Sequence, residues 1–214
     1  MRVSSFFVVM ILCSGNFMAY SQEGNDRNTI ITNLSGAHSV YFSAGFKMNS
    51  STSASVSTLE VKTETNFIGF IGYQYWFSNE GAVNLTVGSF SSESNVSYMN
   101  ISSNSIVPIL FGFSYYPKKL SLGRVGRVRV GANMGIYMGN ASKTNVSFVN
   151  IGSSAVNETV FGVEPNAGVD FFVTNWLRIG PSISYHFISE FKEVIGDRKN
   201  YSGPVFLFNI GVVL

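Results

Sequence analysis

The sequence predicts an all-β fold: an eight-stranded antiparallel up-and-down transmembrane β-barrel. Residues 127–138 place an apolar side chain at every second position from Val128 to Met138, which is the period of a strand with one apolar and one polar face. At about 3.3 Å per residue this stretch reaches roughly 40 Å, enough to cross a bilayer at a tilt. Six further stretches alternate in a similar way and a seventh, residues 64–77, is apolar on both faces. Alternately long and short connections join them, a pattern typical of membrane barrels.

The composition agrees with this class. The 214 residues suit one domain, 45% are apolar and only 12% are charged, about half the share of a soluble domain. The mean hydropathy is +0.21, yet beyond the N-terminus no uninterrupted apolar run reaches the ~18 residues of a membrane helix. The net charge of +2 gives no reason to expect a nucleic-acid partner.

The N-terminus reads as a secretory signal over residues 1–21. Arg2 precedes an apolar core at 6–12, and Ala19-Tyr20-Ser21 fits a cleavage site. A lipoprotein acylated at Cys13 is an alternative, but the bulky Leu12 disfavours it, and an uncleaved anchor helix would be too short. Residues 22–36 form a polar leader, and residues 37–214 form the predicted barrel domain.

The first four strands are predicted at residues 37–48, 64–77, 83–88 and 105–116. The first, third and fourth alternate clearly, whereas residues 64–77 are apolar on both faces. We place Phe67, Ile71 and Tyr73 of that strand outside, together with Tyr75 and Phe77, because this leaves Gly72 and Gln74 inside. Residues 78–81 are typical of a tight turn between the second and third strands.

The last four strands are predicted at residues 127–138, 159–173, 177–187 and 203–214. Short turns begin at Pro117 and Thr174, and polar loops are expected at residues 49–63, 91–104, 139–158 and 189–202. Both ends of the barrel domain then lie on the short-turn side, which is periplasmic in bacterial barrels.

Two features complicate this scheme. Pro108, Pro165 and Pro181 fall within strands and remove ladder donors, so we expect bulges or strand ends there. Residues 56–63 and 97–101 still alternate inside predicted loops. The strands therefore either continue beyond the membrane as projecting hairpins, whose edges could bind another protein by strand addition, or give way to ordinary polar loops.

Alternation alone does not decide which face is outside, because a soluble lipocalin-type barrel would turn the apolar face inward. Charge is scarce where a soluble exterior should be rich in it. The other face is rich in glycine, which suits a narrow lumen, and the chain stops on an apolar strand residue, Leu214. These observations favour the apolar face toward lipid.

The signal, the eight amphipathic strands and the ending Phe208-Asn209-Ile210-Gly211-Val212-Val213-Leu214 resemble the small bacterial outer-membrane β-barrel family of the OmpX, OmpA-barrel and OmpW kind. The resemblance covers the mature chain but rests on pattern. It implies a monomer in the outer membrane, in contact with outer-membrane lipids, whose terminal strand is read by the barrel-assembly machinery. Leu214 departs from the usual terminal aromatic residue.

Two sets of residues are candidate sites. A lumen charge network is predicted from inward-facing positions on neighbouring strands: Arg127, Arg129, Glu164, Asp170, Arg178 and His186. An aromatic girdle at the membrane interface is predicted beside the short turns: Tyr73, Tyr75, Trp76, Phe77, Tyr115, Tyr116 and Trp176. Buried opposite charges should pair, so the charges either plug the lumen or form a conducting constriction.

The predicted role is structural or surface-interacting, adhesin-like through the outer loops, with an extracellular protein or surface ligand as partner. The alternative is a narrow porin-like channel for small or hydrophobic solutes. Enzymes exist on this architecture, but the chain has only His38 and His186. A set of His186, Ser189 and Glu190 is explained by chance among so many serines. No metal spacing or cofactor fingerprint is present, so we expect neither metal, cofactor nor catalysis.

Overall fold

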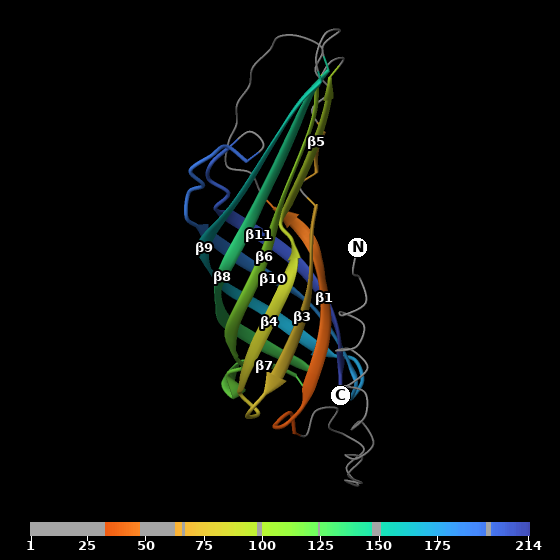
Figure 1. The fold of residues 1–214 in the computed structure, drawn as a ribbon. Coiled ribbons are helices and arrows are strands. Elements are labelled where there is room, and N and C mark those ends of the chain that lie inside the picture. The colour runs from red at the N-terminus through yellow and green to blue at the C-terminus, as the bar shows by residue number, and fades with distance from the viewer. Residues whose placement is uncertain are drawn as a thin grey trace.

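The computed structural model describes residues 33–47, 63–65, 67–97, 100–123, 125–146, 151–195 and 198–214. The predicted signal, residues 22–32 of the leader and residues 48–62 lie outside this part of the chain. The strands are β1 (His38–Lys47), β2 (Thr63–Thr65), β3 (Phe67–Trp76), β4 (Gly81–Ser89), β5 (Ser91–Ser97), β6 (Asn100–Tyr115), β7 (Ser121–Leu122), β8 (Gly126–Val146), β9 (Ile151–Phe172), β10 (Leu177–Ile188) and β11 (Gly203–Val213), with one 3-10 turn, η2 (Lys118–Leu120). Figure 1 shows their arrangement.

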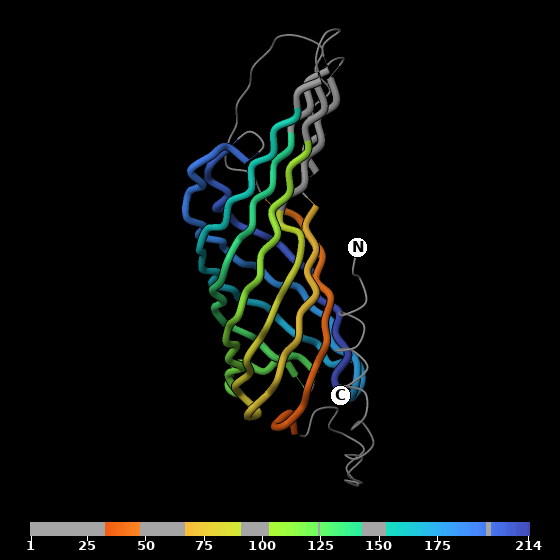
Figure 2. Tube along the Cα trace, in the orientation of Figure 1, coloured from red at the N-terminus to blue at the C-terminus, as the bar shows by residue number. Residues whose placement is uncertain are grey.

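Eight of these strands close a barrel, as predicted. Around it run β1, β3, β4, β6, β8, β9, β10 and β11, each antiparallel to its neighbours, and β11 pairs with β1 to complete the circle (Figure 2). The short connections after β3, β6 and β9 lie at the end of the barrel that also carries the C-terminus. We call this the turn end and the opposite one the loop end.

At the loop end a sheet projects beyond the barrel, formed by β2, β5 and the outer parts of β6, β8 and β9. We call residues 63–65, 91–97, 100–106, 139–146 and 151–160 the projecting sheet. β8 and β9 pair without a break from Gly126↔Phe171 to Val146↔Ile151, and β6 pairs with β8 out to Asn100↔Asn145.

The projecting sheet corrects two expectations. The predicted polar loops at 91–104 and 139–158 are wrong where the structure describes them, that is, apart from residues 98–99 and 147–150. The projecting-hairpin alternative is confirmed for Ser97, Asn100 and Ile101, whereas residues 56–62 and 98–99 lie outside the described part. Ser and Asn are common in loops. A hairpin already in register nevertheless gains ladder hydrogen bonds with each added pair, which offsets the entropy of ordering those residues.

The prolines behave in two ways. Between the pairs Val87↔Ile109 and Ser91↔Ile106 the β4–β5 side has one residue more than the β6 side, so a bulge lies opposite Pro108 as predicted. The expected bulges or strand ends at Pro165 and Pro181 are wrong. Both lie inside β9 and β10, where pairing lapses beside each proline on the β9–β10 seam but resumes in the same register. A lost donor is therefore accommodated without a change of register.

The outer face of the barrel is apolar. Its exposed side chains include Phe42, Ile71, Phe111, Met134, Phe161, Phe187 and Phe208, while Ser39, Ser43, Gln74, Asn84 and Asn209 face inward and are buried. This confirms the orientation predicted from the alternation. β1 and β11 have 10 and 11 residues, and strands of this length span an apolar band of about 25 Å when tilted.

Within the described residues, no helix is long and apolar enough to cross a bilayer.

Candidate functional site

The turn end of the lumen is closed by apolar side chains. Trp76, Tyr116, Phe172 and Val213 form a buried cluster with Ala82 and Leu34. Leu34 comes from the segment preceding β1, where the backbone N–H groups of Leu34 and Ser35 both donate to Asn79 Oδ1, at 2.7 and 3.3 Å. The segment before β1 thus places Leu34 in the turn-end mouth of the lumen.

The burial of Trp76 and Tyr116 contradicts their assignment to the outer aromatic girdle. Trp76 is 0% and Tyr116 2% exposed. Trp76 lies two residues beyond the inward-facing Gln74, and Tyr116 two beyond Ser114, so the strand alternation turns both into the lumen. The other predicted girdle residues, Tyr73, Tyr75, Phe77, Tyr115 and Trp176, lie on the outer side.

A group of ion-paired side chains lies next to this cluster, inside the lumen. The Asp170 carboxylate accepts from Arg178 Nη1 at 2.9 Å and from the Tyr116 hydroxyl at 2.9 Å, and Arg129 Nη1 lies 3.8 Å away. Arg178 also donates through Nε to Ser39 Oγ at 3.2 Å, and its guanidinium stacks over Trp76 and Tyr41. Asp170 and Arg178 are each at most 2% exposed. The attraction between their charges therefore offsets the free-energy cost of removing both groups from water.

The remaining three residues of the predicted charge network lie apart from this group. Arg127 is at the turn-end mouth, where Nη1 donates to the backbone carbonyl of Asn79 at 2.9 Å. Glu164 accepts from Asn133 Nδ2 at 3.0 Å. The His186 ring hydrogen-bonds the Tyr137 hydroxyl at 2.7 Å and Ser184 Oγ at 3.2 Å, with Glu164 3.9 Å away. The structure therefore divides the predicted network into three parts: Arg127 at the turn-end mouth, the Asp170 group, and Glu164 with His186.

Hydroxyls and amides fill the middle of the lumen. Asn209 bridges Ser43 to Ser182, and Asn84 donates to Ser114 Oγ at 2.8 Å. The cavity among these side chains, which Arg129 and Glu164 also line, measures about 30 Å³. That is room for roughly two water molecules.

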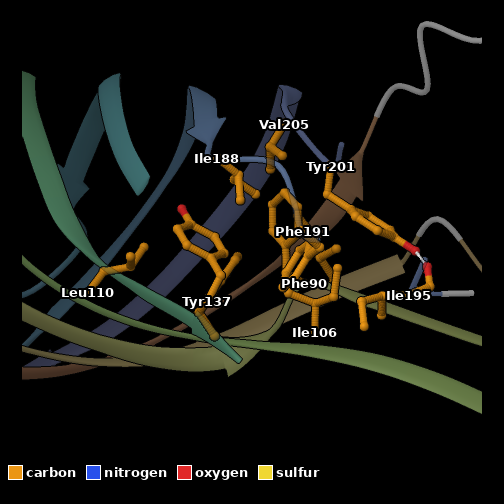
Figure 3. Close-up of a cluster of buried hydrophobic side chains, with 11 residues drawn as sticks. Phe90, Ile106, Leu110, Tyr137, Ile188, Phe191, Ile195, Tyr201 and Val205 are labelled. Atoms are coloured by element: carbon orange, nitrogen blue, oxygen red, sulfur yellow. Dashed lines mark hydrogen bonds between the residues drawn. The ribbon is translucent and has the colours of Figure 1, made fainter. Parts of the chain in front are cut away.

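The loop end of the lumen is closed by a second apolar cluster (Figure 3). Its members are Ile68, Phe70, Phe90, Ile106, Leu110, Tyr137, Ile188, Phe191, Ile195, Tyr201 and Val205. Three of them, Phe191, Ile195 and Tyr201, belong to the connection between β10 and β11 and are each at most 1% exposed. They are large apolar residues in an otherwise polar connection, a composition that predicts a loop but not the burial of these three side chains.

Glu158 of the projecting sheet holds this connection from outside the membrane-spanning part. Its two carboxylate oxygens accept from the backbone N–H groups of Lys192 and Glu193, at 2.8 and 3.0 Å. These bonds, with smaller contributions from the charges of Lys192 and Lys199, lower the pKa of Glu158 below its ordinary value. The stabilising contribution of this carboxylate is therefore present at neutral pH and is lost as the pH falls through the lowered pKa.

The histidines do not assemble a catalytic set. His186 points into the lumen, whereas Ser189 and Glu190 are exposed beyond it. His38 hydrogen-bonds the Tyr73 hydroxyl through Nδ1 on the outer side. Among the described residues, no three His, Cys, Asp or Glu side chains cluster as metal ligands would.

No protein-family model matches the sequence, and no curated protein matches it. Solved structures do resemble the chain. OprG, an outer-membrane protein of Pseudomonas aeruginosa, superposes with a TM-score of 0.51 at 13% identity, covering 88% of this chain and 99% of OprG. Ail, the attachment invasion locus protein of Yersinia pestis, in complex with the heparin analogue sucrose octasulfate, gives a TM-score of 0.50 at 13% identity, covering 85% of this chain and 100% of Ail. The chain therefore has the fold of the small eight-stranded outer-membrane β-barrels.

Proposed function

We propose that this protein is a monomeric barrel of the bacterial outer membrane whose projecting sheet binds another polypeptide outside the cell, while its own lumen stays sealed. The signal at residues 1–21 would export it, and the barrel-assembly machinery would insert it by way of β11. The proposal gives the barrel a structural task, which is to hold a sheet edge at a fixed height above the lipid.

The free edge of β9 is the observation that carries this proposal. β10 pairs with β9 only from Gly162 toward the turn end, so within the described residues β9 pairs with β8 alone from Ile151 to Val160. Such an edge presents unpaired N–H and C=O groups, which are a template for strand addition. Among its described residues the projecting sheet has only four charged side chains, Glu64, Glu93, Lys143 and Glu158, so it carries few of the charges that usually blunt an edge.

A polypeptide fits this surface better than a sulfated polysaccharide does. Ail is seen with a heparin analogue, and a polyanion of that kind needs a cluster of basic side chains. The projecting sheet has Lys143 as its single basic residue. Backbone pairing needs no charge, and it gives affinity with little dependence on side-chain identity.

Replacing Ala155 with proline should abolish binding through this edge. The carbonyl of Phe161 points toward the β10 side, where it accepts from Ser189 N–H. Because backbone groups alternate along a strand, Ala155 N–H points to the same open edge. Proline removes that donor and places its ring there. We expect cells that display this variant to lose adhesion to plates coated with a protein made of β-sandwich modules, because such a protein offers edge strands for pairing.

Ala155→Thr is the matched control, because it keeps the donor and the strand preference and should adhere like the parent. Equal adhesion of the proline variant and the parent would remove the edge from the proposal. Competition of adhesion by soluble heparin would instead indicate a polysaccharide ligand.

The sealed lumen makes a prediction of its own. The polar cavity in mid-lumen supports the alternative of a narrow channel, but apolar clusters close both of its ends. We expect no stable openings when the protein is reconstituted in planar bilayers at physiological salt. Stable openings would contradict the seal, and their loss in an Arg129→Ala variant would place the constriction beside Asp170.

A further inference from the structure

The connection between β10 and β11 is a compact unit of its own. We call residues 189–195 and 198–202 the mouth hairpin. Phe191 N–H donates to the Lys199 carbonyl at 3.0 Å, and Ile195 N–H donates to the Arg198 carbonyl at 3.1 Å. The Tyr201 hydroxyl donates to the Ile195 carbonyl. These bonds join the two halves of the hairpin to each other, so it can move as one body.

Its attachment to the ends of the strands is narrow. Ile188 N–H donates to Ser202 Oγ at 2.9 Å, and the same hydroxyl donates back to the Ile188 carbonyl at 3.1 Å. Ser189 N–H then reaches the Phe161 carbonyl of β9 at 2.9 Å. Both ends of the hairpin thus meet the barrel at one point, which is the geometry of a hinge.

Apolar, cation–π and carboxylate contacts hold the hairpin against the barrel, and the cation–π contact places Lys47 Nζ of β1 4.9 Å from the centre of the Tyr201 ring. The underside of the hairpin fills the mouth with Phe191, Ile195 and Tyr201 (Figure 3). Its rim is bound by Glu158 through two backbone N–H groups. The apolar contact is non-directional, so it favours a closed mouth for many orientations of the hairpin. The hydrogen bonds to the Glu158 carboxylate are directional and form only when the hairpin lies against the projecting sheet.

We propose that the mouth hairpin is a hinged lid over the outer end of the lumen, with Glu158 as its latch. The latch stands on β9, the strand that carries the open edge of the projecting sheet, so the position of that sheet and the closure of the lumen are mechanically linked. Opening would expose the apolar cup lined by Phe90, Ile188 and Val205 to the cell exterior only, because the turn-end cluster stays closed beneath it.

Cysteine accessibility on the full-length protein in detergent micelles tests the lid. The single natural cysteine is Cys13, and Cys13→Ser removes it. In this background Ile195→Cys reports on the buried underside of the lid, and the rate of its modification by a bulky maleimide measures opening. With the latch intact we expect slow labelling, and Glu158→Ala should raise the rate about threefold or more, because two hydrogen bonds to a charged acceptor are lost.

Controls separate a moving lid from a loosened barrel. Glu190→Ala, which removes an exposed carboxylate of the same hairpin, should leave the rate unchanged, and Glu158→Gln should fall between the parent and the alanine variant. Ser43 is 2% exposed in mid-lumen, so the cysteine of Ser43→Cys should stay unlabelled in the presence and in the absence of the Glu158 substitutions. If Ile195→Cys does not fold, Phe191→Cys replaces it as the reporter.

An unchanged rate in Glu158→Ala would overturn the latch. Equal increases at Ile195→Cys and Ser43→Cys would overturn the lid, because they would mean general unfolding. Neither outcome depends on whether the projecting sheet binds a partner.

Discussion

Asp170→Ala is expected to destabilise the barrel by about 3–5 kcal/mol, the range for breaking a buried ion pair by removing one partner. The carboxylate of Asp170 is 1% exposed and is the acceptor for Arg178 Nη1 and for the Tyr116 hydroxyl. Its removal leaves two buried guanidinium groups, Arg178 and Arg129, without their shared counter-charge. Equilibrium unfolding by urea in lipid vesicles, followed by the mobility of unheated samples on gels, measures the loss.

Asp170→Asn should cost less than Asp170→Ala, because the amide oxygen still accepts a hydrogen bond while the charge is gone. Glu80→Ala is the surface control: Glu80 pairs with Lys118 at 2.8 Å, where Lys118 is 74% exposed. A solvent-exposed pair contributes little, so this variant should unfold at the same urea concentration as the parent. A mild effect of Asp170→Ala would show that the arginines are hydrated, and the sealed lumen would then be wrong.

The barrel could be predicted because the same alternation of apolar and polar residues recurs along the sequence. A closed sheet in lipid needs its strands to alternate between an apolar and a polar face, and seven of the eight segments show that alternation, residues 64–77 being apolar on both faces. The inward position of Arg129, Glu164, Asp170, Arg178 and His186 follows from that period alone. Their grouping does not, since which inward side chains meet depends on strand register, and register is set by pairing between segments far apart in sequence.

Three features differ from the prediction, each for its own physical reason. Nearness to turns predicts Trp76 and Tyr116 in the outer girdle, but the alternation of their own strands turns both side chains inward. The polar composition of the projecting sheet predicts loops, yet a hairpin can be extended by pairing with any residues once its register is set. The mouth hairpin depends on Glu158, 34 residues before Lys192, and local sequence patterns do not detect a contact of that range.

Met134→Arg tests the orientation on which the membrane assignment depends. Met134 lies near the middle of the barrel wall, is 56% exposed on the outer face and pairs across the sheet with Phe111 and Val163. An arginine facing lipid near the bilayer midplane should destabilise the folded barrel by about 2–4 kcal/mol. Urea unfolding in lipid vesicles measures the change, and the variant should also insert more slowly from the unfolded state.

Ser142→Arg gives the matched control on the same strand. Ser142 is exposed in the projecting sheet, beyond the span that lipid covers, and an added charge there should change stability by less than about 0.5 kcal/mol. The contrast between the two arginines is the informative quantity, because both lie on β8 and both are solvent-accessible in the absence of lipid. If the two variants were equally stable in vesicles, the apolar outer wall would not be in contact with hydrocarbon. The exposed phenylalanines would then have to be covered by protein, and the barrel would be part of a larger assembly rather than a single membrane-spanning unit.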